Sequence, residues 1–100
     1  MNHNIFNTTG GVYVFGANGR GQLGLSDTQV RYRPAKLDFE PQILSIACGA
    51  FHTIFHTNQG LYVCGRNVKG RLGLGDARSR NIPTKLDFEP PILSIDCELS

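Results

Sequence analysis

The sequence has 100 residues, of which 40% are hydrophobic and 18% are charged, and its formal net charge is +2. This length fits one small domain with a modest core. Ile, Leu, Val and Phe recur along the whole chain, which excludes a disordered protein. A charge of +2 is too small to indicate nucleic-acid binding by itself, and no stretch approaches the roughly 18 apolar residues of a membrane span.

The cysteines and the N-terminus both bear on the cellular compartment. Cys48, Cys64 and Cys97 form no C-x-x-C motif and leave an odd thiol, so we expect reduced, mostly buried thiols rather than a disulfide scaffold. The N-terminal residues MNHNIFNTTGG lack the basic and apolar regions of a secretory signal peptide. These observations favour an intracellular protein, either nuclear or cytoplasmic.

The sequence contains an internal repeat with a period of 49 residues. Tyr13 corresponds to Tyr62, which gives an offset of 62 − 13 = 49, and the block KLDFEP recurs unchanged at 36–41 and 85–90 with the same offset. The chain therefore reads as a single repeat domain over residues 1–100, divided into a partial repeat 1–11, a repeat 12–60 and a partial repeat 61–100.

Short strand-like runs follow one another between turn residues. The segment 3–8 is in register with 52–57, and a tight turn and an Asn-Gln-Gly turn flank the second of these two segments. About four short strands fall in each unit, and no segment has a convincing helical period. Repeated units of this size are typical of β-propeller blades. We expect an all-β fold of two consecutive four-stranded antiparallel blades, a partial propeller, with strands at 12–15, 43–48, 51–57, 61–64 and a segment after Pro83.

The repeated motifs resemble the regulator of chromosome condensation repeat. The pattern of that family is close to V-Y-x-W-G-x-N-x-x-G-Q-L-G-x-G, then P, then I-x-x-I-x-C-G-x-x-H-T. This chain offers VYVFGANGRGQLGL, Pro34 and ILSIACGAFHT, then LYVCGRNVKGRLGLGD, Pro83 and ILSIDC. The resemblance covers essentially the whole chain. It implies blades of a closed propeller of about seven blades, serving as an exchange factor for a small nuclear GTPase, a chromatin binder or an interaction module.

The stretch GRGQLG has the glycine spacing of a dinucleotide-binding turn. The second unit has Val68 where the first has Gly19, and no helical period follows the glycines to provide a helix N-terminus for a pyrophosphate. We therefore expect no cofactor. The glycines are expected instead to allow positive φ angles and close packing at the edge of a blade.

Two histidines, His52 and His56, raise the possibility of a metal site. On a strand, four residues span about 13 Å, which is too far for two imidazoles to share an ion comfortably. The sequence also lacks a nucleophile elbow and a Walker motif. We expect no metal and no active site, so the protein is predicted not to be an enzyme.

Basic residues gather in the two loops that precede Pro34 and Pro83. Because the units are in register, these loops should emerge on one face of neighbouring blades, apart from the acids of the two LDFE segments. The sequence favours a non-enzymatic protein-interaction module that binds through these loops, although a merely solvated loop face is the other interpretation. The alternatives are a guanine nucleotide exchange factor for a small GTPase and a chromatin- or nucleic-acid-binding propeller. The candidate contact residues are Arg20, Arg31, Arg33, Arg66, Lys69, Arg71, Arg78 and Arg80.

The last four residues, CELS, match a C-a-a-X farnesylation signal at Cys97. Cys97 is also the copy of Cys48 in a strand-like run, and the residues before it are not polybasic. We expect no membrane contact unless Cys97 is prenylated. Since propellers close with roughly four to eight blades, self-association to complete a ring is a further expected interaction.

Overall fold

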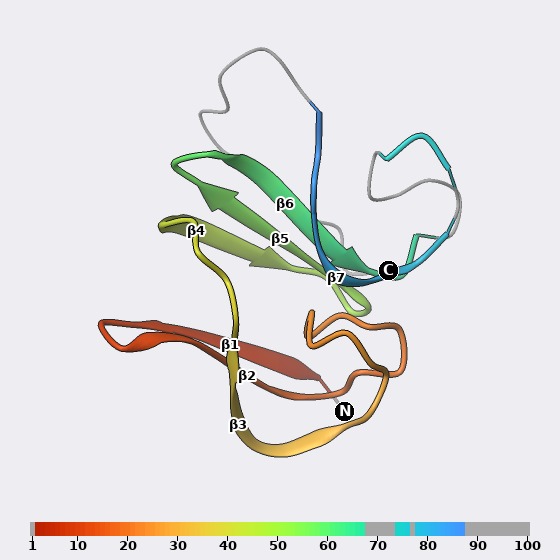
Figure 1. Cartoon of the computed structure of the whole chain (residues 1–100). Coiled ribbons are helices and arrows are strands. Elements are labelled where there is room, and N and C mark those ends of the chain that lie inside the picture. The colour runs from red at the N-terminus through yellow and green to blue at the C-terminus, as the bar shows by residue number, and fades with distance from the viewer. Residues whose placement is uncertain (1, 68–73, 77, 88–100) are drawn as a thin grey trace.

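The computed structural model describes residues 2–67, 74–76 and 78–87, which form two antiparallel sheets (Figure 1). Within these residues no helix is long and apolar enough to cross a bilayer. Sheet 1 has the strand order β1-β2-β3 and comprises β1 (His3–Thr8), β2 (Gly11–Gly16) and β3 (Arg31–Leu37). Sheet 2 has the order β4-β5-β6-β7 and comprises β4 (Ile43–Cys48), β5 (His52–Thr57), β6 (Gly60–Gly65) and β7 (Arg80–Lys85).

The expected all-β fold of propeller blades is confirmed, with one difference in strand number. Sheet 2 has the four strands that were predicted, whereas sheet 1 has three in the described part of the chain. The counterpart of β4 in sheet 1 would start 49 residues before Ile43, at 43 − 49 = −6, which is ahead of residue 1.

The strand pairing repeats with the 49-residue offset of the sequence. His3 pairs with Gly16 in sheet 1, and His52 pairs with Gly65 in sheet 2. Each sheet also has a register shift just before that glycine, in the pairing with its last strand. The predicted repeats and the observed sheets are nevertheless out of phase, because β1 lies before residue 12, whereas β2 spans that residue and β3 follows it. Each sheet therefore draws its strands from two of the predicted repeats, whose division of the chain stays a prediction.

The prolines lie inside strands rather than ahead of them. Pro34 falls within β3 and Pro83 within β7, so β7 begins at Arg80, before the position expected from the sequence. Both strands are the last in the order of their sheets. A residue without an N–H is tolerated there, because one side of an edge strand needs no ladder hydrogen bond.

The core lies between the two sheets, which are stacked in Figure 1. Val12 and Val14 alternate with more exposed residues along β2, as expected for a strand with one buried face. They meet Phe55 and Cys64 of sheet 2, and Leu23 of the β2–β3 loop completes this cluster. Burial raises the pKa of the Cys64 thiol to about 12.

One cysteine departs from the expectation of mostly buried thiols. Cys48 is exposed, whereas Cys64 is buried. The reason is that β4, which carries Cys48, is the first strand in the order of sheet 2 and is covered by a neighbouring strand on one side only.

Candidate interaction surface

The loop between β2 and β3 is held by a buried asparagine. Asn18 is 1% exposed, and its side-chain Nδ2 donates hydrogen bonds to the carbonyls of Asp27 at 3.1 Å and Gln29 at 2.9 Å. Its Oδ1 accepts the Leu23 N–H at 3.0 Å. Arg31 then donates to both carboxylate oxygens of Asp27, at 3.2 and 2.7 Å. These contacts fold the loop back on itself.

The same contacts recur in the second unit. Asn67 donates to the carbonyls of Asp76 and Arg78, both at 2.9 Å, and Arg80 donates to the two carboxylate oxygens of Asp76 at 3.1 and 2.9 Å. Hydrogen bonds from Arg80 hold the pKa of Asp76 down to about 2. We call each set the loop staple, formed by Asn18, Asp27 and Arg31 in the first unit and by Asn67, Asp76 and Arg80 in the second.

The loop staples change the expected distribution of charge. The prediction from the sequence considered only the acids of the LDFE segments, and it overlooked Asp27 and Asp76, which lie inside the basic loops. Arg31 and Arg80 face these carboxylates, with side chains 28% and 19% exposed, whereas the side chain of Arg78 is 84% exposed. Arg31 and Arg80 thus have a structural role, and a binding role for them stays a prediction.

A separate cluster forms where the two sheets meet. The guanidinium carbon of Arg20 lies 5.9 Å from the ring centroid of Phe51, and that of Arg66 lies 5.5 Å from it. Both distances are within the range of cation–π attraction. Arg20 belongs to the β2–β3 loop of sheet 1, whereas Phe51 precedes β5 and Arg66 follows β6 in sheet 2. We call these three residues the arginine–phenylalanine cluster.

The backbone beneath this cluster is common to both units, but the side chains are not. The Arg66 N–H donates to the Phe51 carbonyl at 2.8 Å, an approach that a side chain at Gly65 would block. In sheet 1 the equivalent bond joins the Ala17 N–H to the Asn2 carbonyl at 3.0 Å. The repeated backbone is therefore a scaffold, and the cluster belongs to this one junction.

Two of the three glycines of GRGQLG pack against the neighbouring sheet, whereas a Cβ on Gly19 would meet nothing within 4 Å. Gly21 and Gly24 have φ angles of 78° and 76°. A Cβ on Gly21 would lie 2.6 Å from the Cα of Asn81, and one on Gly24 would lie 3.1 Å from Pro83. The expected roles in positive-φ turns and close packing are confirmed for these two glycines and not for Gly19. The Ser26 N–H then donates to the Asn81 carbonyl at 2.8 Å and fastens the loop to β7.

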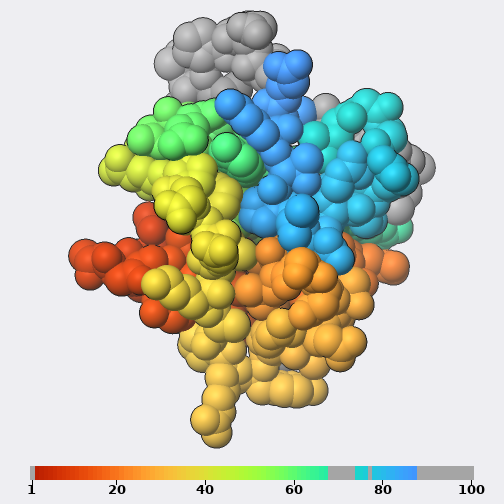
Figure 2. Space-filling model, in the orientation of Figure 1, coloured from red at the N-terminus to blue at the C-terminus, as the bar shows by residue number. Residues whose placement is uncertain are grey.

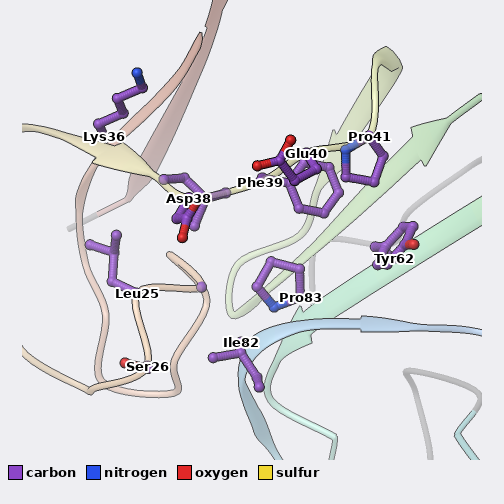
Figure 3. A pocket seen from close by; sticks show the side chains of 12 residues that line it. Leu25, Ser26, Lys36, Asp38, Phe39, Glu40, Pro41, Tyr62, Ile82 and Pro83 are labelled. Carbon is purple, nitrogen blue, oxygen red and sulfur yellow. The ribbon is translucent and has the colours of Figure 1, made fainter.

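Two hollows lie along the junction of the sheets. The first, of about 360 Å³, is bordered by Arg20 and Thr28 on one side and by Ser79 and Asn81 on the other. The second, of about 620 Å³, lies under the linker that joins β3 to β4, and Figure 3 shows the linker side chains facing β7 across it. Figure 2 shows the same linker in yellow beside β7 in blue. Asp38 and Glu40 border this second hollow. Both acids follow the last residue of β3, whereas the basic loop precedes its first residue.

Comparison with known families identifies the repeats. The family model described as "Regulator of chromosome condensation (RCC1) repeat" matches residues 9–55 and 59–97, and a second model of the same description matches 43–71. The chain belongs to the RCC1 repeat family. No curated protein gives a significant match to the sequence.

Several solved structures resemble this RCC1 repeat chain. Human WBSCR16 is 31% identical with a TM-score of 0.73, over 88% of this chain and 24% of that one. Prp20p from Saccharomyces cerevisiae is 30% identical with a TM-score of 0.77, over 93% and 26%. Yeast RCC1 (Prp20), in its complex with Kap60, is 27% identical with a TM-score of 0.76, over 97% and 26%. The chain spans about a quarter of the length of these proteins.

The other residues singled out in the RCC1 repeats take different positions. Arg33 is exposed on β3. His52 is buried, and the described residues contain no group of three or more His, Cys, Asp or Glu side chains that could hold a metal ion. Lys69, Arg71 and Cys97 lie outside the described residues.

Phe51 and the loop staples were not singled out from the sequence. The staples do leave a signal, because an Asn is followed by an Asp and then by an Arg at 18, 27 and 31 and again at 67, 76 and 80. Phe51 has no such signal, since its counterpart in the first unit is Asn2.

Proposed function

We propose that this chain is a non-enzymatic, intracellular protein-interaction module that binds an acidic partner surface. Its contact surface is the arginine–phenylalanine cluster together with the basic loops beside it. Besides Arg20 and Arg66, the proposed contact residues are Arg33 and Arg78, with Lys69 and Arg71 added from the sequence. Arg31 and Arg80 support these contacts by keeping the loops in shape.

The proposal rests on the lack of a carboxylate partner for the two arginines that stack on Phe51 in the described part of the chain. In the part of the chain that the structure describes, no carboxylate pairs with Arg20 or Arg66, in contrast to Arg31 and Arg80. An aromatic ring positions a guanidinium without neutralising it. Each guanidinium therefore keeps donors for a bidentate contact with a carboxylate of a partner. Phe51 is 37% exposed and adds apolar area to the same surface.

Similar proteins support a protein partner. The structure of Prp20p was described together with binding of that protein to Gsp1p and histones, and yeast RCC1 (Prp20) was solved bound to Kap60. The matching part is about a quarter of each protein, so these partners come to this chain as hypotheses. Guanine nucleotide exchange on a small GTPase and binding to chromatin or nucleic acid are the two alternatives.

The proposal is tested with a fluorescently labelled glutamate-rich peptide as the acidic probe. We expect the chain to bind it, and Arg20→Ala or Arg66→Ala to weaken binding by about tenfold each, which corresponds to about 1.4 kcal/mol. Lys36→Ala is the matched control. Lys36 is an exposed cation near the opposite end of β3, so its removal changes the net charge equally without touching the cluster. Equal losses in all three variants would contradict a specific site.

Two further probes separate the alternatives. Release of a labelled nucleotide from Gsp1p, accelerated by the chain, would favour the exchange-factor function. Binding to a short DNA duplex that weakens steeply between about 50 and about 200 mM salt would favour the nucleic-acid function, because phosphate contacts release counterions. The proposed function predicts neither result.

A further inference from the structure

The hollow of about 620 Å³ under the β3–β4 linker has mostly apolar walls. Tyr62 of β6 lines it together with Ile82 and Pro83 of β7, and Leu25 of the β2–β3 loop completes these walls (Figure 3). Ile82 is 51% exposed although it is a large aliphatic residue. We call this hollow the linker groove. Its volume is in the range of sites that hold small ligands.

The exposure of Ile82 follows from an irregularity in β7. Val63 pairs with Thr84 and Gly65 pairs with Arg80, so the three residues 81–83 lie opposite Cys64 alone. Such a bulge turns side chains out of the regular alternation of a strand. Ile82 and Pro83 thereby border the linker groove, and the backbone of β7 fixes this apolar wall.

The linker adds two carboxylates to the apolar walls. Asp38 and Glu40 are both exposed, and both border the groove. The ring of Phe39 between them packs on Phe55 and on Tyr62, with a centroid distance of 5.1 Å in each case. This anchored ring holds the linker in place and keeps both carboxylates at the groove.

Neither carboxylate is neutralised by a cation of the described residues. No ion pair among them includes Asp38 or Glu40. Lys36 also borders the groove, but its end lies over β2, where a Cβ on Gly11 would be 2.8 Å from Lys36 Cε and 3.6 Å from its Nζ. Figure 3 shows the Lys36 side chain pointing away from Asp38. The linker groove thus combines apolar walls with local negative charge.

This combination is complementary to an arginine side chain. The methylene stem of an arginine can lie along apolar walls while its charged end stays at the rim. The planar guanidinium forms bidentate hydrogen bonds with a carboxylate and stacks on aromatic rings, which a strongly hydrated lysine ammonium does less well. The formal net charge of the chain is +2, so the attraction for a cation is local to the groove rather than general.

We propose that the linker groove binds an arginine side chain of a partner protein. The guanidinium lies at Asp38 and Glu40, and the methylene stem lies along Ile82 and Pro83. The groove is beyond the last residue of β3, whereas the basic loop of sheet 1 precedes its first residue. This inference therefore concerns a different surface from the proposed function and stands independently of it.

A titration followed by proton–nitrogen correlation NMR tests the proposal. The probe is a tripeptide with blocked termini and one arginine between two glycines. We expect saturable shifts of the backbone amides of Asp38, Glu40, Tyr62 and Ile82. The same peptide with lysine should bind at least about threefold more weakly, and the peptide with neutral glutamine should cause no saturable shifts at these positions.

Charge-removing variants test the two carboxylates. Asp38→Asn and Glu40→Gln keep the size of each side chain, and we expect each to weaken arginine binding about threefold and the double variant about tenfold. Asp87→Asn is the matched control and should leave the affinity unchanged. Asp87 is the copy of Asp38 in the second unit, since 38 + 49 = 87, and it is exposed but does not border the groove.

A further variant, Ile82→Ser, tests the apolar wall. Because this side chain is already 51% exposed, the variant should keep the spectrum of the folded chain while binding the arginine peptide more weakly. Shifts that spread over the surface without saturation would overturn the proposal. So would equal weakening in Asp38→Asn and Asp87→Asn, or a lysine peptide that binds as tightly as the arginine peptide.

Discussion

The hydrogen bonds of Thr53 determine which ring nitrogen of His3 carries a hydrogen at the junction of the sheets. The single hydroxyl hydrogen of Thr53 goes to the Gln22 carbonyl, so the oxygen must accept from Nε2–H of His3. His3 is 7% exposed. Burial lowers the pKa of its imidazole below the ordinary value of 6.5, and the charge of nearby His52 lowers it further. The neutral ring is therefore part of the contact between the sheets.

The lowered pKa of His3 predicts a pH-dependent stability. The unfolded chain takes up a proton near pH 6.5, whereas the folded chain resists it until a lower pH. The stabilisation is thus complete above about pH 6.5 and is lost as the pH falls towards the folded pKa. His3→Gln, which keeps a donor for Thr53, should reduce this dependence, as measured from urea unfolding midpoints across this range. An unchanged dependence in His3→Gln would show that other groups cause it.

At the scale of elements, the two long loops obtain their shape from their own side chains. The staple residues recur in both loops with nearly the same distances, although the residues between them differ. Asn18 and Asn67 are both buried, at 1% and 0% exposure. A buried amide that satisfies several backbone groups is costly to remove, because those groups then lack partners.

The staple predicts a clear difference between two asparagines. Asn18→Ala leaves the Leu23 N–H and two carbonyls without their partner, and we expect it to lower the free energy of unfolding by about 1–3 kcal/mol. Asn7→Ala, at an exposed position of β1, should change it by less than about 0.5 kcal/mol. Denaturant unfolding measures both, and similar values for the two variants would contradict the role of the staple.

At the scale of the whole molecule, stability depends on the contact between two sheets rather than on either sheet alone. The buried cluster takes residues from both sheets and from the β2–β3 loop. Phe39 packs against this cluster from the linker, which thereby acts as a third component of the core. We therefore expect both sheets to unfold together.

Phe39 and Phe6 form a matched pair for testing this dependence. Phe39→Ala should lower the free energy of unfolding by about 2 kcal/mol, because it removes the ring contacts with Phe55 and Tyr62. Phe6 lies on an exposed face of sheet 1. Phe6→Ala should lower the free energy of unfolding by less than about 1 kcal/mol when measured at a concentration where the chain is monomeric. A larger loss for Phe6→Ala than for Phe39→Ala would contradict this description of the core.

The fold was predictable from the sequence because it depends on short-range patterns of turn and strand residues. The runs 43–48 and 61–64 correspond to β4 and β6, since turn residues and β-rich segments recur with one period. The surface was less predictable. Arg31 and Arg80 appeared available for binding because their carboxylate partners are set by how the loops fold back.

The arginine–phenylalanine cluster shows the same limit of sequence reasoning. Arg20 and Phe51 come from different sheets and meet only because the β2–β3 loop docks on sheet 2. No residue spacing within one repeat predicts the contact between Arg20 and Phe51. The counterpart of Phe51 in the other unit is an asparagine.

The loop staple has a consequence for protein engineering. Because three fixed side chains keep each loop in shape, the exposed positions between them, such as Thr28 and Gln29 in the first loop, are open to randomisation without redesign of the backbone. A library that varies these positions and keeps both staples would present a variable loop beside a constant one on one rigid support. The molecule is thus a natural template for selecting new binding proteins.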